Sequence, residues 1–307
     1  MTSKPNTKHP PRLRSRRKKV EDWISNLLFR VALWFMLRLP WRLRLKFAAA
    51  LTSRFIAPVA GWRRRIRDNL AKVLPDLSPE EVNRLEREVP ANVGRAFIEI
   101  YSPGDLVDRV KDEKLTGPGV VALEKAKNEG RPALLVTGHI GNYDAVRIGL
   151  LLRGYPVGGL YKPMANSYFN EHYVKAIEKI GKPMFPKSRA GMAGMLRFLR
   201  EGGMLGIVLD QYMANGAPLE FMGEPALTAL SAADLALKFD ALIVPVYGIR
   251  RPDSGFDLII GQEIPRGTAE EMTQALNDDL EIQVNAHPEQ WIWMHRRWRP
   301  APKNLSS

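Results

Sequence analysis

The feature that most constrains the fold is an alternation of short apolar runs and helical patterns along the C-terminal part of the chain. Apolar runs typical of buried strands occur at 133–137, 157–161, 204–209, 242–249 and 256–261. Helical patterns lie between them at 142–153, 166–180, 189–200 and 231–239. Strand–helix alternation of this kind indicates an α/β fold whose sheet is covered on both faces. We therefore expect a mixed, mostly parallel central sheet flanked by helices.

The N-terminal part of the chain has a different pattern, in which helices dominate. Residues 78–81, Ser-Pro-Glu-Glu, form a capping box with proline at the first helical position, and they predict a helix that runs to about Tyr101. A Pro-Gly pair at 118–119 precedes a further helix near 120–128. These signals divide the chain into a helical region at 21–115 and an α/β domain at 116–307.

The charge of the chain is strongly basic and uneven. Lys and Arg outnumber Asp and Glu by 46 to 33, and eight basic residues with no acid precede Glu21. This Pro-containing polar segment, 1–20, is predicted to be a disordered basic tail. The formal net charge of +13 favours an anionic partner: nucleic acid, phospholipid headgroups or an acidic carrier protein. Cysteine is absent, which excludes disulfides, a thiolate nucleophile and thiolate zinc sites.

Two segments after the tail have the composition of helices that lie at a membrane. Residues 23–39 are mostly apolar but are interrupted by Arg30 and Arg38, so the uncharged part is shorter than the roughly 18 residues of a spanning helix. The following segment, 41–56, mixes leucines with basic residues, Arg42, Arg44 and Lys46. This composition favours interfacial helices at an anionic bilayer. The alternatives are two core helices of a soluble domain and a tilted span with snorkelling arginines.

The residues after the first buried run are the strongest candidates for chemistry. The run ends just before Gly138-His139, and Asp144 follows five residues after the histidine. Residues five apart on one helix point to different faces, so the two meet only if His139 lies in a turn and Asp144 in the first helical turn. Gly141 permits such a turn and Asn142 fits a helix N-cap. The pattern predicts a histidine base held by a carboxylate; a purely structural turn is the alternative.

The sequence contains no other recognisable catalytic or metal-binding motif. The chain has no Gly-x-Ser-x-Gly elbow and no Walker loop. Residues 117–122 match the dinucleotide fingerprint only loosely, because a charged stretch and not a buried strand precedes them. The remaining histidines are His9, His172, His287 and His295. Their spacing is not that of metal ligands, so no metal site is predicted.

The motif His139-x-x-x-x-Asp144 resembles the signature of the glycerolipid and lysophospholipid acyltransferase superfamily. The wider pattern resembles one branch of it, the lipid A biosynthesis late acyltransferases, which add lauroyl or myristoyl groups. The resemblance covers residues from about 23 to 299. It is carried by these blocks: 65–70, 74–77, 137–144, 161–163, 188–192, 209–211, 221–223 with Thr228, 244–246 with Arg250, and 287–298.

Three departures from that branch leave the reaction class intact and the acceptor open. The late acyltransferases usually carry Glu where this chain has Asp144, whereas the glycerolipid relatives carry Asp. The chain has Tyr161-Lys162-Pro163 in place of Tyr-Arg-Pro, and the run after Asp210 lacks a second acid.

The resemblance implies transfer of an acyl chain from a thioester, on acyl carrier protein or coenzyme A, to a hydroxyl. The thioester is a co-substrate, and no cofactor is expected. His139 is expected to take the proton of the acceptor hydroxyl, while Asp144 fixes the tautomer of the imidazole and stabilises the imidazolium.

Five further residues are expected to contact substrate. Arg189 matches a family position and is expected to bind a phosphate of the acceptor or the donor; a surface arginine at a helix start is the alternative. Asp210 ends a strand at the edge expected for His139, where it would orient Arg189 or the acceptor, or merely cap a turn. Asn142, Tyr161 and Lys162 are weaker candidates for lining the site.

The basic charge fits the partners that the resemblance implies. Acyl carrier protein, lipid A precursors and phospholipids are all anionic, and a basic tail would recruit them less strongly as salt rises. The positive-inside rule keeps the tail in the cytoplasm and places the catalytic domain on the inner face of the inner membrane. Acceptors that stay open are a lysophospholipid, a lyso-aminolipid or another glycolipid. A basic nucleic-acid-binding or membrane-adaptor protein would leave the histidine motif unexplained, so no nucleic-acid partner is expected.

Overall fold

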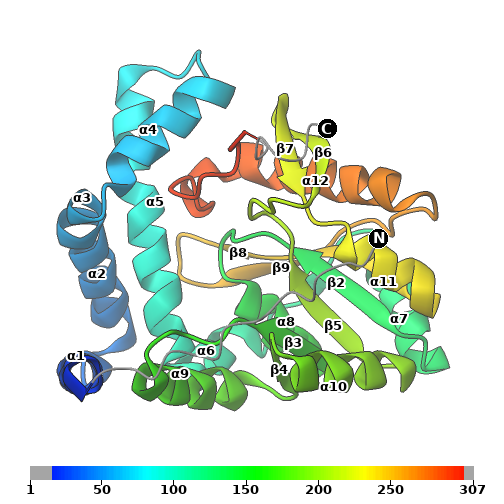
Figure 1. Cartoon of the computed structure of the whole chain (residues 1–307), viewed down its shortest axis with the longest axis horizontal. Helices are drawn as coiled ribbons and strands as arrows, with labels where there is room; N and C mark the ends of the chain where they lie inside the picture. Colours follow the sequence, from blue (N-terminus) through cyan, green and yellow to red (C-terminus); the bar gives the residue numbers. More distant parts are fainter. Residues whose placement is uncertain (1–15, 301–307) are drawn as a thin grey trace, which may run out of the picture.

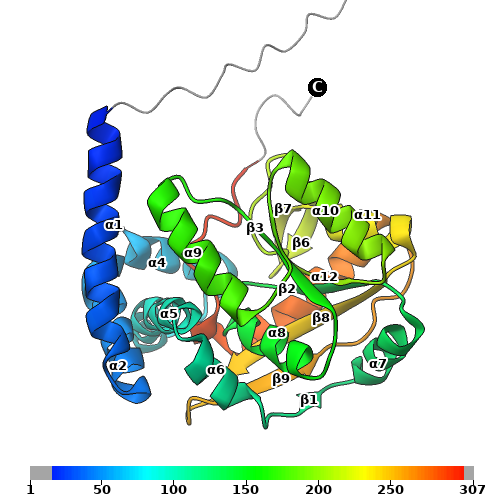
Figure 2. The ribbon, with the colours of Figure 1, turned by 90° about the horizontal axis from the view of Figure 1, so that it is seen from below.

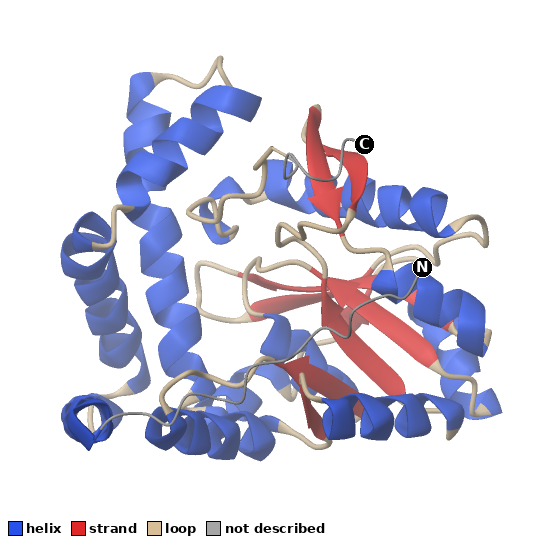
Figure 3. Cartoon of the chain, viewed as in Figure 1, coloured by secondary structure: helices blue, strands red, loops and turns tan. Residues whose placement is uncertain are grey.

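A seven-stranded sheet with the strand order β1-β9-β8-β2-β5-β3-β4 lies at the centre of the computed structural model, which describes residues 16–300 (Figure 1, Figure 3). Its neighbouring strands pair in parallel except β8 and β9, which are antiparallel. The predicted mixed, mostly parallel sheet is therefore confirmed. The strands are β1 (Leu115–Thr116), β2 (Ala133–Thr137), β3 (Val157–Tyr161), β4 (Met184–Pro186), β5 (Met204–Val208), β8 (Leu242–Arg250) and β9 (Phe256–Ile260).

Helices precede the sheet in the chain and cover both of its faces. In chain order the helices are α1 (Arg16–Leu37), α2 (Trp41–Leu51), a π-helical turn η1 (Thr52–Ile56), α3 (Ala57–Val59), α4 (Trp62–Val73), α5 (Pro79–Ile100), α6 (Pro103–Val110), α7 (Val120–Glu129), α8 (Tyr143–Leu152), α9 (Ser167–Ile180), α10 (Arg189–Arg200), α11 (Ser231–Phe239), α12 (Ala269–Ala286) and the 3-10 turn η2 (Pro288–Gln290). A separate antiparallel hairpin joins β6 (Ala217–Phe221) to β7 (Glu224–Thr228). The hairpin, α12 and the short edge strands β1 and β4 have no counterpart among the predicted elements.

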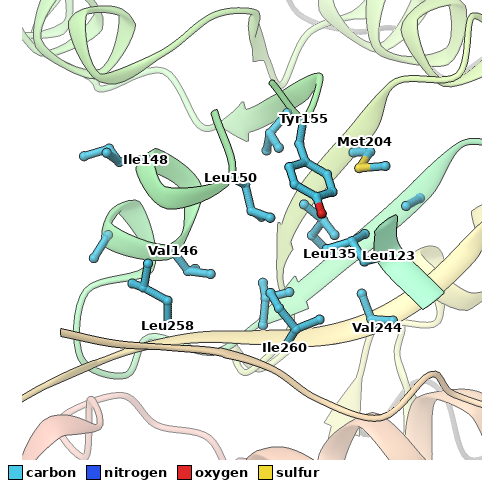
Figure 4. Close-up of a cluster of buried hydrophobic side chains, with 14 of the residues drawn as sticks. Leu123, Leu135, Val146, Ile148, Leu150, Tyr155, Met204, Val244, Leu258 and Ile260 are labelled. Atoms are coloured by element: carbon cyan, nitrogen blue, oxygen red, sulfur yellow. The ribbon is translucent and has the colours of Figure 1, made fainter. Parts of the chain in front are cut away.

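Strand β2 shows how its apolar run builds two cores at once. Successive side chains of a strand point to opposite faces. Ala133 and Leu135 pack in the cluster under α6, α7 and α8, part of which Figure 4 shows. Leu134 and Val136 pack in the cluster under α10, α11 and α12. Because both faces are covered, the strand reads as a continuous apolar run without alternation.

The N-terminal helices share cores with the sheet region. Ile66 of α4 packs in one cluster with Trp291 and Trp293 near the C-terminus, and Leu106 of α6 packs in the cluster under α8. The capping box at the start of α5 is confirmed, with the Ser78 hydroxyl accepting from the amide of the third helical residue. The boundary near residue 115 stays a prediction.

Helix α1 begins at Arg16, so the last five residues of the predicted tail are helical; residues 1–15 lie outside the described part of the chain. Among residues 16–300, no helix combines the length and the apolarity that crossing a bilayer requires.

Arg44 is not the exposed interfacial residue that the sequence favours. It is 7% exposed, and its Nη1 donates to Asp105 at 2.7 Å and to Ser102 at 2.8 Å. Its Nη2 donates to the carbonyls of Leu37 and Leu39, both at 3.0 Å. These carbonyls lie at the last residue of α1 and in the turn that follows it, where backbone acceptors lack helical partners. Arg44 therefore holds the corner between α1 and α2 onto the start of α6.

We expect Arg44→Ala to lower the free energy of unfolding by about 2–4 kcal/mol, because it leaves several polar groups of this corner without partners. Arg42→Ala is the matched control: Arg42 lies two residues away on the same helix and is exposed, so its loss should change stability by no more than about 0.5 kcal/mol. Thermal unfolding of the two variants is the measurement. Equal effects would contradict the structural role of Arg44.

Candidate active site

His139 and Asp210 meet at the carboxyl edge of the sheet. They follow β2 and β5, which are neighbouring parallel strands with Thr137 opposite Val208. The Nδ1 of His139 lies 2.7 Å from Oδ1 of Asp210, and the backbone amide of His139 donates to Oδ2 at 2.6 Å. The carboxylate is fully buried, while the histidine side chain keeps 27% of its surface exposed. The ring is thus held from inside and remains accessible from outside.

Trp291 supplies a third hydrogen bond to the carboxylate. Its Nε1 donates to Oδ2 of Asp210 at 2.8 Å, and its backbone forms a β-bridge with Ile140 next to the histidine. Trp291 is itself completely buried. The sequence analysis included Trp291 in the block 287–298 but predicted no role for it; the density of tryptophan, histidine and arginine in that block was the available signal.

The charges of this pair favour the ion-pair form. Burial disfavours protonation of His139, but the charge and the hydrogen bond of Asp210 outweigh it, so the pKa of His139 is raised above its ordinary value. Burial likewise opposes ionisation of Asp210, but the charge of His139 and hydrogen bonds from His139 and Trp291 lower the pKa of Asp210. Asp210 therefore stays ionised and can fix the imidazole tautomer and stabilise an imidazolium.

Asp144 does not make the contact that the sequence predicts for it. Its carboxylate pairs with Arg147 one helical turn along α8, at 3.3 Å, and both side chains are buried. Burial raises the pKa of Asp144, against the opposing charge of Arg147. Asp144 is the second residue of α8, and its side chain points toward Arg147 on the same helix. The ring of His139 points instead toward Asp210, which follows the adjacent strand β5. The contact that fixes the tautomer belongs to Asp210, and a catalytic role of Asp144 stays a prediction.

Asn142 is the N-cap of α8, as the sequence predicts. Its Oδ1 accepts from the amide of Asp144 at 2.9 Å, and its Nδ2 donates to Glu99 at 2.7 Å. The side chain is 4% exposed, so both ends of its amide contact protein and are not presented to a substrate. Gly141 precedes it with φ of 57°, and a Cβ there would lie 2.2 Å from the carbonyl of Gly248. Only glycine fits this turn.

A buried polar network holds the turn in place. Glu99 of α5 is fully buried and forms a two-pronged ion pair with Arg250 at the end of β8, with one prong at 2.7 Å. Arg250 Nε also donates to Asn92 of α5 at 3.2 Å. The carbonyl of Gln290 accepts from Asn92 and from the amide of Gly141. The sequence predicted no role for Glu99 or Asn92, because nothing near them along the chain indicates a distant partner.

The remaining candidates line the same sheet edge in the order of the strands. The order β2, β5, β3, β4 places His139, Asp210, Tyr161 with Lys162, and then Arg189 side by side. Strands lie about 4.8 Å apart, so the ends of β2 and β4 are about 14 Å apart. Arg189 and Lys162 are exposed, and Tyr161 is half-buried. Asp210 contacts His139 and Trp291, so the expectation that it orients Arg189 is wrong.

An apolar cavity opens beside the histidine, between α8 and the strands β2, β3 and β5. Tyr143 forms part of its wall and packs edge-on against the His139 ring, with ring centroids 6.0 Å apart. Burial raises the pKa of Tyr143 far above its ordinary value, which keeps its hydroxyl neutral. The other lining residues are mostly apolar: Leu135, Thr137, Asp144, Val146, Arg147, Leu150, Val157, Gly159, Leu160, Met184, Gly206, Ile207, Val208 and Val246.

Two residues of the C-terminal block anchor the segment that follows Asp210. His295 Nε2 accepts from the amide of Tyr212 at 3.0 Å. Arg297 is fully buried and donates to the carbonyl of Leu227 at 2.8 Å and to Thr228 Oγ1 at 2.6 Å. Burial lowers the pKa of Arg297 to about 10. Among residues 16–300, no three His, Asp or Glu side chains gather as a metal ion would require.

A partly exposed histidine held by a buried carboxylate, at the edge of a mostly parallel sheet, has the arrangement of an acid–base site. The chain belongs to the bacterial lipid A biosynthesis acyltransferase family, whose pattern it matches over residues 11–300, and it is an acyltransferase. It is similar to the lipid A biosynthesis palmitoleoyltransferase of Escherichia coli (strain K12), with 25% identity over 90% of this chain and 91% of that protein. The lipid A biosynthesis lauroyltransferase of the same organism is 24% identical over 90% and 91%. The phosphatidylinositol mannoside acyltransferase of Mycobacterium tuberculosis (strain CDC 1551 / Oshkosh) is 23% identical over 78% of each chain.

We expect Asp210→Asn to lower kcat/KM by about 10²–10⁴-fold, because the imidazole loses its tautomer and its counter-charge. A base must be unprotonated, so the activity of the wild type should rise with pH through the raised pKa of His139. Without the Asp210 charge this pKa falls, so the rise should move to lower pH. Asp144→Asn is the control and should leave the position of the rise unchanged. A pH–rate profile in which Asp144→Asn gives the larger shift would contradict the assignment.

We expect Trp291→Phe to lower kcat/KM about 10–100-fold, because it removes a hydrogen bond to an ionised group worth roughly 1.5–3 kcal/mol. Trp293→Phe is the matched control, since its Nε1 donates to the carbonyl of Pro288 at 2.7 Å and not to Asp210. Both variants lose one indole N–H of a buried ring. Turnover per folded molecule, measured beside thermal unfolding, should fall only for Trp291→Phe; equal turnover in the two variants would refute the positioning role.

Proposed function

We propose that the protein is a membrane-associated O-acyltransferase that transfers a fatty acyl chain from an acyl thioester to a hydroxyl of a lipid A precursor. The observation that carries the proposal is the pair formed by His139 and Asp210 at the sheet edge, in a chain of the bacterial lipid A biosynthesis acyltransferase family. The donor is acyl carrier protein or coenzyme A charged with the fatty acid.

The reaction follows from the hydrogen bonding of the histidine. Nδ1 of His139 faces Asp210, which leaves Nε2 for the substrate. Nε2 takes the proton of the acceptor hydroxyl while that oxygen attacks the thioester carbonyl. The new carbon–oxygen bond forms, the carbon–sulfur bond breaks, and the imidazolium returns its proton to the leaving thiolate. Asp210 stabilises the imidazolium throughout, and no covalent enzyme intermediate is needed.

The apolar cavity has the lining of an acyl site, but its volume of about 70 Å³ holds only part of a fatty acyl chain. It lies next to the edge that carries His139, and Tyr143 forms part of its wall. Apolar walls with few polar groups are typical of sites for such chains.

Arg189 and Lys162 fit the anionic part of an acceptor or of the donor. Both are exposed at the sheet edge, and neither side chain forms an ion pair with a residue in the described range 16–300. Their strands lie about 10–14 Å from β2, so these side chains reach a phosphate remote from the reacting hydroxyl and not the hydroxyl itself. A guanidinium holds a phosphate in a forked geometry that lysine does not reproduce.

Membrane association rests on an exposed apolar surface, here called the N-terminal apolar surface. Helix α1 stands at the outer edge of the molecule (Figure 2), and exposed arginines and lysines flank the apolar residues. Exposed apolar and basic side chains on the same helices favour binding at the interface of an anionic bilayer, on the cytoplasmic face of the inner membrane. The surface consists of Val20, Trp23, Ile24, Leu27, Leu28, Val31, Trp34, Phe35, Leu43, Phe47, Leu51, Phe55, Ile56 and Val59.

A different acceptor is the second candidate. The similarity to phosphatidylinositol mannoside acyltransferases favours it, because the acceptor named for those relatives is a glycolipid other than lipid A. A lysophospholipid or lyso-aminolipid belongs to the same class of acceptor. The chemistry at His139 is the same for each.

Lipid mass spectrometry of cells that lack the protein distinguishes the two acceptors. We expect lipid A that lacks one secondary acyl chain, restored by wild-type protein and not by His139→Ala, since a general base contributes about 10²–10⁴-fold to the rate. If lipid A is unchanged and a lysolipid or an under-acylated glycolipid accumulates, the lipid A precursor is rejected as the acceptor and the second candidate is supported. Full restoration by His139→Ala would refute the mechanism for either acceptor.

A further inference from the structure

A second pocket lies between α1 and α9. The two helices contact each other; α1 lies along the border of the molecule and α9 runs obliquely away from it (Figure 2). The pocket has a volume of about 490 Å³ and includes none of the residues placed in the active site. Its lining comes from both helices and from the start of α6: Arg30, Leu33, Trp34, Leu37, Tyr101, Pro103, His172, Lys175, Ala176, Glu178, Lys179 and Lys182.

The rim of this pocket is strongly basic. Lys182 pairs with Glu178 at 3.4 Å, and Lys175 pairs with Glu171 at 2.7 Å. The other two cations, Arg30 and Lys179, approach from opposite helices, and neither side chain forms an ion pair or hydrogen bond with a residue of the described part of the chain. The pocket therefore keeps an excess of positive charge, because one arginine and three lysines line it against a single acid, Glu178.

The inner wall carries polar atoms without partners. Tyr101 is 7% exposed, and its buried hydroxyl has no hydrogen-bond partner among the described residues. The Nδ1 of His172 is also buried and unpartnered, and its ring stacks on Tyr101 with centroids 5.4 Å apart. Leaving a buried donor unpaired costs about 1–3 kcal/mol, so such groups in one pocket point to a missing ligand.

The groups around His172 disfavour its protonation. Burial lowers the pKa of His172, and the positive charges of Arg30, Lys175 and Lys179 lower it further. An anion bound among those cations would offset their charge and raise the pKa of His172. The ring thus reports on occupancy of the pocket.

The pocket borders the N-terminal apolar surface. Trp34 lines the pocket and belongs to that surface, with 51% of its area exposed, and the guanidinium of Arg38 lies 4.2 Å above its ring. Leu33 and Leu37 add apolar lining on the α1 side. A ligand with a charged head and an apolar tail would fit the cations and these walls together.

We propose that this pocket binds the phosphate of an anionic phospholipid headgroup and so anchors the protein to the bilayer at a point separate from the catalytic edge. The proposal rests on the membrane association in the proposed function. Arg30 and Lys179 contact the phosphate oxygens, and the Tyr101 hydroxyl donates to the headgroup. The glycerol and the first methylenes lie along Leu33, Trp34 and Leu37.

The first test compares binding to vesicles of phosphatidylcholine with and without phosphatidylglycerol. A basic residue near an anionic membrane contributes about 1 kcal/mol, so the double variant Arg30→Gln/Lys179→Gln should bind the phosphatidylglycerol vesicles roughly 30-fold more weakly. The control Arg200→Gln/Lys238→Gln loses one arginine and one lysine from α10 and α11, away from α1 (Figure 1). Its net charge changes equally, and it should bind nearly as the wild type does. Equal losses of vesicle binding in the two double variants would refute the proposed lipid site in this pocket.

The second test uses NMR titration of the His172 ring, assigned with His172→Asn. Dihexanoyl phosphatidylglycerol below its micelle concentration should raise the pKa of His172, whereas inorganic phosphate at the same concentration should not. Tyr101→Phe should weaken lipid binding without loss of stability, because it removes a hydroxyl that has no partner in the protein. If inorganic phosphate raises the pKa of His172 equally, the ligand is a soluble anion and the lipid proposal is wrong. If neither ligand raises this pKa, the site itself is refuted.

The tests separate failure of this proposal from failure of the proposed function. If wild-type protein ignores phosphatidylglycerol vesicles, the membrane association itself is refuted. If the wild type binds and Arg30→Gln/Lys179→Gln binds equally, only the pocket is refuted. With the pocket correct, the double variant should need more lipid surface for half-maximal acyl transfer but reach the wild-type kcat, because neither residue contacts the reacting groups.

Discussion

The buried carboxylate of Asp210 is the group on which the rest of the site depends. Taking an ionised carboxylate out of water costs several kcal/mol unless its oxygens are paired. Here a backbone amide and two side-chain nitrogens occupy the oxygens, and they come from β2 and the C-terminal block. Any movement of the turn at His139 or of the strand-like segment at Trp291 leaves that charge without partners. The geometry of the base is therefore coupled to the packing of the C-terminal block.

The helical N-terminal part of the chain completes this arrangement. Glu99 and Asn92 of α5 reach across to Arg250 and Gln290, which in turn hold the backbone at Gly141. The same helix ends at the corner that Arg44 fixes, where α1, α2 and α6 meet. Helices that carry the N-terminal apolar surface are thus connected by contiguous polar contacts to the turn that holds the base. Helix α5 is thus the element through which a membrane bound at this surface would be connected to the turn that holds the base.

The sequence predicted what local patterns determine. Apolar runs gave the parallel strands, and the capping signals at Ser78 and Asn142 located helix starts within a residue. Local patterns could not predict partners that depend on strand order. Strand β5 lies next to β2 although three helices and two strands separate them in the chain. Chain proximity therefore favoured Asp144 over Asp210 as the partner of His139. Arg44 looked like its neighbours Arg42 and Lys46, because nothing local distinguishes a buried arginine from an exposed one.

The position of Asp144 changes what its identity means. An Asp in place of the Glu of late acyltransferases first left the acceptor open, when residue 144 was expected to hold the imidazole of His139. Instead its carboxylate lies in the wall of the apolar cavity, paired with Arg147, whose Nη2 also donates to the carbonyl of Gly181 at 2.5 Å. A side chain one methylene longer would push this ion pair along the cavity or break it, and a broken buried pair costs several kcal/mol. Residue 144 therefore bears first on the shape of this cavity and on the contact of α8 with Gly181 at the end of α9, and only through them on a substrate.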